Sequence, residues 1–118
     1  LLSQQLPAIP MNRFRGNIIL DNVPAFIEHQ SESLKITRHD DNQTCTIDFC
    51  NPCERCNVPG IDQLTGLVPT AQQPLKTLFN MEHVDKKGAF FGQNAVLATS
   101  SKNMVGHMIY VGDKVSII

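Results

Sequence analysis

Residues 34–49 read LKITRHDDNQTCTIDF, and this stretch decides the fold class. Leu34–Thr37 and Thr44–Phe49 each alternate apolar with polar side chains, which is the period of a half-buried β-strand. The residues that link them, HDDN, have side chains that favour a turn. The stretch therefore predicts a β-hairpin. In its second strand Cys45, Ile47 and Phe49 are expected to share one face, and Thr44, Thr46 and Asp48 the other.

Shorter patterned segments lie on both sides of this hairpin. Extended structure is expected at Arg13–Leu20, at Phe90–Thr99 and at His107–Ile118, the last folded as a hairpin about Gly112-Asp113. Short helices or turns are expected at Leu1–Leu6, Asp21–Gln30 and Leu75–Met81, and a structured loop at Asn51–Gly66. The pattern predicts one mainly β domain, closed or nearly closed into a barrel, with short helices outside it.

Composition excludes several classes of partner. The chain has 118 residues, of which 42% are hydrophobic and 18% charged, and its formal net charge is −1. This balance lacks the basic surface that nucleic acids or anionic membranes attract. No apolar run approaches the ~18 residues of a membrane-spanning helix. The four cysteines lie within 12 residues and are expected to be reduced, which favours a cytoplasmic location.

Residues 50–56 read CNPCERC and carry three thiols at intervals of three. An iron–sulfur cluster or a structural zinc needs four ligands, for which Cys45, His29 or His39 are the available additions. Alternatively, the single thiolate of Cys56 ligates a metal that a cofactor already holds, and the adjacent arginine favours that thiolate. A third interpretation is that the cysteines bind no metal and serve as small buried hydrophobic residues. The residues alone leave all these interpretations open.

Residues 13–17 read RFRGN and form the second motif. In a strand the two arginines project to one face, where they are suited to bind a phosphate in bidentate fashion. A solvated pair of charges at a strand edge is the alternative interpretation. Asp62 is expected to form a turn rather than to act as a general base.

The order of these motifs resembles the MOSC family. The matching blocks are Arg-Phe-Arg-x-Asn, Pro-Cys-x-Arg-Cys, Val-Pro-x-Ile-Asp-x-x-Thr-Gly, Pro-Leu-Lys-Thr-Leu, Phe-Gly-Gln-Asn and Val-Gly-Asp-x-Val. They extend from Pro10 to Ile118 and look closest to the branch of the mitochondrial amidoxime-reducing components and the bacterial YcbX-type proteins.

The resemblance implies a MOSC-type β-barrel that holds a molybdenum cofactor (molybdopterin) through one cysteine. Carried onto this sequence, the metal ligand and catalytic cysteine is Cys56. Glu54 and Arg55 would approach the pterin or its phosphate, and Arg15 and Asn17 would hold the phosphate end of the cofactor. The implied activity is two-electron reduction of N-hydroxylated small molecules, with electrons from a flavin-, haem- or iron–sulfur-containing partner.

The sequence departs from the family pattern at Gly16, where proline is usual, and at Glu54, where serine is frequent. Members of this branch carry an N-terminal β-barrel and further MOSC strands. Residues 1–118 are therefore expected to be the C-terminal portion of a MOSC domain, inactive as a fragment.

Two other functions fit the resemblance. One is a sulfur-carrier or cofactor-handling module of a molybdenum cofactor sulfurase, in which a separate upstream domain binds pyridoxal phosphate. The other is a degenerate domain kept for protein interaction, for which Gly16 and Glu54 are the support. The upstream sequence would discriminate the sulfurase from the reductase.

Overall fold

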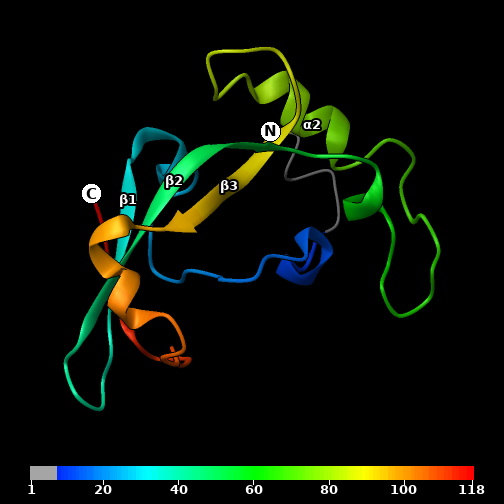
Figure 1. The fold of residues 1–118 in the computed structure, drawn as a ribbon. Helices are drawn as coiled ribbons and strands as arrows, with labels where there is room; N and C mark the ends of the chain where they lie inside the picture. The colour runs from blue at the N-terminus through cyan, green and yellow to red at the C-terminus, as the bar shows by residue number, and fades with distance from the viewer. Residues whose placement is uncertain (1–7) are drawn as a thin grey trace. The chain divides into compact units, whose positions relative to one another are not determined.

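A computed structural model of the chain describes residues 8–118 (Figure 1). In chain order, with 3-10 helices labelled η, the elements are η1 (Met11–Phe14), η2 (Ile27–Gln30), β1 (Ser33–Thr37), β2 (Thr44–Glu54), η3 (Val58–Gly60), α2 (Leu75–Met81), β3 (Phe90–Leu97), η4 (Thr99–Met104) and β4 (Lys114–Ile117). The helix expected at Leu1–Leu6 lies outside the described residues. The predictions of α2 and of an extended segment at β3 are confirmed.

The predicted hairpin is confirmed. β1 and β2 pair antiparallel, with Leu34 opposite Ile47 and Ile36 opposite Cys45. The turn between them is closed by a hydrogen bond from the N–H of Asn42 to the carbonyl of Arg38 (3.0 Å). Alternation of side chains along paired strands thus brings the apolar residues to one face.

β4 extends the hairpin on the other side of β1. It pairs antiparallel with β1, so that Ile117 lies opposite Leu34 and Val115 opposite Ile36. Leu34, Ile36 and Cys45 are the buried centre of this core. Partly buried side chains pack around them, namely Leu20, Ile47, Phe49, Met104, Val115 and Ile117. Burial of apolar surface in this cluster is the main force that holds the sheet to its neighbouring segments.

The expected barrel closure is wrong for the part of the chain described. The sheet is four-stranded, in the order β3-β2-β1-β4, so β3 and β4 are its two edges and do not pair with each other. The chain is mainly β, consistent with a MOSC-type fold, but the sheet is open. Among the described residues, none of the helices is long and apolar enough to cross a membrane.

The strand expected at Arg13–Leu20 is also wrong. Pro10 precedes η1, and its carbonyl accepts a hydrogen bond from the N–H of Arg13 (3.1 Å), which starts a 3-10 turn. Arg15 ends that turn in the left-handed conformation, with φ 55°. Ile18 and Ile19 remain exposed, so the apolar run that suggested a strand is not buried in the described residues.

The C-terminal hairpin expected about Gly112-Asp113 is wrong too. The turn runs from Tyr110 to Asp113, closed by a 3.1 Å hydrogen bond from the N–H of Asp113 to the carbonyl of Tyr110. Residues 107–110 form no strand. β4 pairs instead with β1, because the alternation of Val115 and Ile117 completes the core there.

The contacts divide the chain into two compact units. The first unit comprises the chain up to Ile19 together with Pro52–Gly92, and the second comprises Leu20–Asn51 together with Gln93–Ile118. The hairpin core belongs to the second unit. All five residues predicted to bind a cofactor belong to the first unit, namely Arg15, Asn17, Glu54, Arg55 and Cys56.

Candidate functional site

Cys56 lies in the loop that follows β2 in the first unit. Just before it, the N–H of Arg55 donates to the carbonyl of Ala89 at 2.7 Å. Just after it, the N–H of Gly60 donates to the carbonyl of Asn57 at 3.0 Å and forms the turn of η3. The backbone is therefore fixed on both sides of Cys56, whereas the cysteine itself is exposed. An exposed thiol on a fixed loop is accessible to an incoming metal as a soft ligand.

Arg15 lies at the end of η1, and its backbone is strained. A φ of 55° at a residue with a side chain costs roughly 1 kcal/mol or more. Arg15 and Asn17 are both exposed. Among residues 8–118, neither side chain has a hydrogen-bond or ion-pair partner. Both side chains are thus available to a ligand, and non-glycine residues in this conformation are often found at functional sites.

The two arginines of the RFRGN motif do not share an environment, contrary to the prediction from strand geometry. Arg13 is buried, with 8% of its surface exposed, whereas Arg15 is exposed. The difference arises because the residues form a 3-10 turn and not a strand, so that positions i and i+2 no longer point the same way. The proposed bidentate fork reduces to one available guanidinium, that of Arg15.

Arg55 brings the two predicted motifs together within the first unit. Its Nη2 donates to the carbonyl oxygen of Phe14 at 2.6 Å, and its Nη1 donates to the sulfur of Cys53 at 3.1 Å. The same guanidinium lies over the ring of Phe14, 5.5 Å from its centroid, and that ring stacks on Phe91 at 4.0 Å. A planar guanidinium with fixed donors is suited to such a three-way contact. Arg55, the residue before Cys56, is therefore hydrogen-bonded to Phe14, the residue before Arg15.

Glu54 is the last residue of β2, and it is exposed. Its carboxylate lies beside Gly88, where an added Cβ would come within 3.2 Å of the Glu54 Oε1. That Cβ would also come within 2.6 Å of the ring of Phe90, so this position admits only glycine. Glu54 therefore lies against the tightly packed turn at Gly88, two residues before Cys56 in sequence.

The other cysteines have separate environments. Cys45 is buried in the core of the second unit, where burial raises the pKa of its thiol. Cys50 is exposed, and Cys53 is half-buried against Arg55. All four cysteines are free thiols. Within residues 8–118, no three side chains of His, Cys, Asp or Glu gather in a group that could hold a metal ion.

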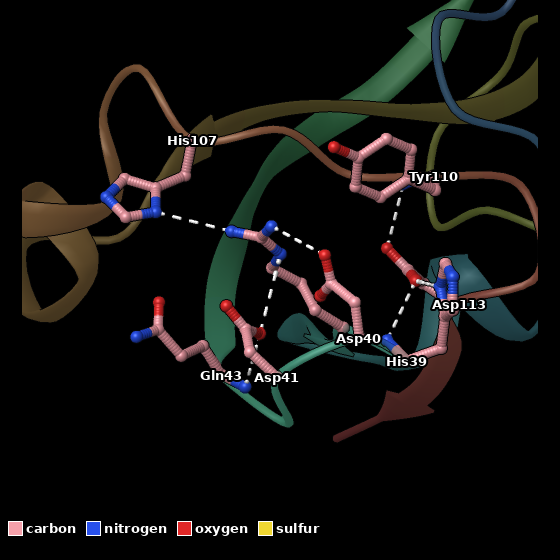
Figure 2. A network of polar contacts seen from close by, with 8 residues as sticks. His39, Asp40, Asp41, Gln43, His107, Tyr110 and Asp113 are labelled. Atoms are coloured by element: carbon pink, nitrogen blue, oxygen red, sulfur yellow. Dashed lines mark hydrogen bonds and ion pairs between the residues drawn. The ribbon is translucent and has the colours of Figure 1, made fainter.

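The two histidines considered as zinc ligands make polar contacts of their own in the second unit. His29 has a nearly buried side chain, and its Nδ1 lies 3.2 Å from the Nε2 of Gln93. The Nδ1 of His39 lies 2.6 Å from the Oδ1 of Asp113 (Figure 2). These contacts tie one segment of the second unit to another.

Asp113 is the centre of one of the two groups of contacts drawn in Figure 2. Its side chain is 3% exposed and accepts hydrogen bonds from the N–H groups of His39 (3.0 Å) and Tyr110 (2.8 Å). The contact with the His39 ring, followed by that with the Tyr110 N–H, lowers the pKa of Asp113 to about 2. The same contact raises the pKa of His39. The second group lies about Arg38, which donates to Asp40 at 3.1 Å. The sequence had suggested only a turn at Asp40.

Several residues of the candidate site escaped prediction from sequence. Gln63 donates from Nε2 to the carbonyl of Asn12 at 2.6 Å, and Arg13 binds the chain near Pro59. These contacts join segments about fifty residues apart in sequence, and no local sequence pattern predicts them. The predicted turn at Asp62 is confirmed, because its Oδ1 accepts hydrogen bonds from the N–H groups of Leu64 and Thr65.

The donor set fits a molybdenum cofactor in chemistry. A thiolate suits a soft metal, a guanidinium suits a phosphate, and an amide adds neutral hydrogen bonds. Cys56, Arg15 and Asn17 supply these three groups, and each is exposed. Glu54 is the one residue whose charge opposes an anionic ligand, and it is exposed as well. Solvent therefore screens its charge.

These features define a mainly β chain with an exposed cysteine in a braced loop beside an arginine-bearing turn. The family model described as MOSC domain matches residues 1–116. The chain belongs to the MOSC domain family, which is associated with molybdenum-cofactor-binding and sulfurase-like proteins. A search of curated proteins finds no match to the chain.

Proposed function

We propose that this MOSC domain binds a molybdenum cofactor through Cys56 and serves as part of an oxidoreductase that reduces N-hydroxylated compounds. Within the family, we propose the branch of the amidoxime-reducing components and the YcbX-type proteins. The order of the six sequence blocks supports this branch.

One contact carries the proposal, the 2.6 Å hydrogen bond from Arg55 to the carbonyl of Phe14. Phe14 precedes Arg15, and Arg55 precedes Cys56, so this bond holds the two predicted cofactor-binding segments against each other. A site that grips both ends of one cofactor needs this proximity. The second motif supplies the metal ligand Cys56, and the first supplies Arg15, whose guanidinium has no partner among residues 8–118.

Each residue has a proposed role. Cys56 is the protein ligand of the metal, and it is the catalytic residue because it would touch the reacting centre. Arg15 binds the phosphate end of the cofactor with its available guanidinium, and Asn17 adds an amide hydrogen bond. Glu54 and Arg55 directly precede Cys56 in the sequence. Arg55 acts mainly as a brace, because its donors already contact Phe14 and Cys53.

The cofactor, when bound, supplies a two-electron reduction in which the substrate's N–O bond breaks and two protons are taken up to give water and the N–H product. The chain's own contribution is to orient that group. The fixed loop keeps the backbone of Cys56 in one position, so little reorganisation of the loop is needed when the metal binds.

Two partners follow from this proposal. One is a small N-hydroxylated substrate, and the other is an electron-donor protein or domain that carries a flavin, a haem or an iron–sulfur centre. A reducing compartment such as the cytoplasm suits the free thiols of all four cysteines.

The test is elemental analysis of the protein expressed with a supply of molybdenum cofactor, followed by an assay of aryl amidoxime reduction with a chemical electron donor. The proposal predicts stoichiometric molybdenum and formation of the amidine. Stoichiometric zinc or iron without molybdenum would contradict it. If the protein contains molybdenum but does not reduce the amidoxime, the proposed cofactor stands and the proposed substrate class is overturned.

A further inference from the structure

The buried arginine of the first unit, Arg13, has no role in the proposed chemistry, yet its contacts lie on the chain just after Cys56. Arg13 donates from Nη1 to the carbonyl oxygen of Pro59 at 3.2 Å, across 46 residues of sequence. Its Nη2 lies 3.5 Å from the Oδ2 of Asp62. The side chain of Arg13 is 10% exposed, and that of Asp62 is 33% exposed. A largely buried guanidinium needs such partners, because an unpaired buried charge is costly.

Asp62 is itself held in a fixed position. Its Oδ1 accepts hydrogen bonds from the N–H groups of Leu64 (2.8 Å) and Thr65 (3.2 Å). These backbone donors, followed by the charge of Arg13, lower the pKa of Asp62 below its ordinary value. The carboxylate therefore stays ionised and fixed beside Arg13, so it orients the guanidinium toward Pro59.

The chain on the far side of Cys56 cannot easily shift. Pro59 is among the most deeply buried residues. Gly60 is buried as well, and a Cβ there would come within 2.8 Å of the backbone oxygen of Gln73. The N–H of Ile61 donates to the carbonyl of Val58 at 2.9 Å. The hydrogen bond of Arg13 thus ends on a tightly packed turn, three residues after the cysteine.

Together with Arg55, this arrangement fastens η1 to the chain on both sides of Cys56. Phe14 accepts the hydrogen bond of Arg55 before the cysteine, and Arg13 binds the carbonyl of Pro59 after it. Both contacts come from the short helix that ends at Arg15. The position of the Cys56 backbone relative to Arg15 is then set by the hydrogen bonds of Arg55 and Arg13, to which the 2.6 Å hydrogen bond from Gln63 to the carbonyl of Asn12 in η1 adds a third.

We propose that Arg13 is a positioning residue, which with Asp62 holds the Cys56 loop against the Arg15 turn, and that it does not bind the cofactor's phosphate. The inference rests on the proposed function only in taking Cys56 as a ligand of molybdenum. The role of Arg13 in holding the Cys56 loop is independent of that function. The two arginines of the RFRGN motif therefore have different roles. Arg13 holds the Cys56 loop in place, and Arg15 binds the phosphate of the cofactor.

The test compares Arg13→Gln with Arg15→Gln and with Arg38→Gln, a matched control that removes an ion-paired arginine from the second unit. Amide hydrogen exchange is measured at Gly60 and Ile61 in the first unit and at Phe49 in the second. Molybdenum content and the electron paramagnetic resonance spectrum of the bound molybdenum are measured on the same proteins. Arg13→Lys, which keeps the charge but loses the fork, covers the case in which Arg13→Gln does not fold.

Arg13→Gln is expected to lower protection at Gly60 and Ile61 roughly tenfold, since a hydrogen bond from a charged group is lost. Protection at Phe49 is expected to stay unchanged. The protein should retain molybdenum but give a shifted spectrum, and Arg13→Lys should partly restore both readouts. Arg15→Gln should lower molybdenum content and leave protection at Gly60 as it is.

A folded Arg13→Gln protein with native protection at Gly60 and Ile61, and with an unshifted spectrum, would overturn the inference. If Arg13→Gln does not fold, the same result in a folded Arg13→Lys protein would overturn it. Loss of molybdenum in Arg13→Gln with native protection would make Arg13 a direct ligand and would overturn it as well. A wild-type protein that takes up no molybdenum would refute the proposed function. In that case the exchange data alone would still decide the role of Arg13.

Discussion

The Nη2 of Arg55 lies 2.6 Å from the carbonyl oxygen of Phe14, and its Nη1 lies 3.1 Å from the sulfur of Cys53. One guanidinium thus joins the end of β2 to the end of η1, two segments that are distant in sequence. Because its donors are engaged, Arg55 stabilises the candidate site from inside. Arg15, with no side-chain partner among the described residues, is the arginine available to an external anion.

Replacing Arg55 with lysine tests whether the Arg55 guanidinium stabilises the contact between the end of β2 and η1. Lysine keeps the charge but cannot reach two acceptors with a planar fork. We expect Arg55→Lys to lower the free energy of unfolding by about 1–3 kcal/mol, since the half-buried carbonyl of Phe14 loses a charged donor. Urea unfolding followed by circular dichroism measures the change. Arg15→Lys is the matched control and should alter stability by less than about 0.5 kcal/mol, because Arg15 is exposed. Equal losses in the two variants would contradict the assignment.

Arg15→Gly should separate stability from binding. The left-handed backbone at Arg15 favours glycine, so we expect the free energy of unfolding to stay constant or rise by up to about 1 kcal/mol. Molybdenum content should fall, because the guanidinium is gone. Asn42→Gly relieves a similar backbone conformation (φ 57°) in the second unit and serves as control. It should leave molybdenum content unchanged. A fall in molybdenum in Asn42→Gly equal to that in Arg15→Gly would show that the effect is not local to the site.

Alkylation should distinguish the cysteines by environment. Cys56 and Cys50 are exposed, whereas Cys45 is 7% exposed in a core where burial raises the pKa of its thiol. Iodoacetamide followed by peptide mass spectrometry should therefore modify Cys50 and Cys56 first. Cys45 should react only when the second unit unfolds, since both access and thiolate formation are suppressed. Modification of Cys45 in the native protein at the rate of Cys56 would contradict the core described here.

The contact between His39 and Asp113 predicts a stability optimum in pH. The pKa of Asp113 falls from its ordinary 3.8 to about 2, mainly because of the contact with the His39 ring. Its contribution is therefore present above pH 3.8 and is lost as the pH falls toward 2. The pKa of His39 is raised above its ordinary 6.5. Its contribution is present below 6.5 and is lost as the pH rises through the folded-state value.

Urea unfolding measured from pH 2 to pH 9 checks this window. The contribution of the pair should be largest between pH 3.8 and 6.5 and should be absent in Asp113→Asn. Asp48→Asn, which removes an exposed carboxylate from β2, is the control and should keep the wild-type profile. An Asp113→Asn profile parallel to that of the wild type over the whole range would show that the pair contributes nothing.

The hairpin at the centre of the second unit could be predicted because its information is local. Leu34 and Ile36 alternate with polar residues, and so do Cys45 and Ile47, so one register brings all four to the same face. The C-terminal turn could not be placed, because Asp113 is held by His39, 74 residues away in sequence. A pattern of glycine and aspartate marks a turn but does not say which segment its aspartate will bind.

The sequence suggests which residues would bind a cofactor, but it does not give their arrangement. Cys56 and Arg15 were expected to bind a cofactor from the order of motifs, and that expectation remains a proposal. The strand expected about Arg15 is wrong because Arg13 is drawn into the interior by Pro59 and Asp62. Such long-range hydrogen bonds override the local preference of an apolar run for a strand.

The most direct test of the central claim is the molybdenum content of Cys56→Ser beside that of Cys50→Ser and Cys45→Ser, all expressed with cofactor supply. We predict that Cys56→Ser loses the metal, whereas Cys50→Ser and Cys45→Ser retain it at the wild-type level. Circular dichroism confirms that each variant is folded. Retention of molybdenum by a folded Cys56→Ser protein would contradict the account. Equal loss of metal in all three variants would point instead to a site shared by several cysteines.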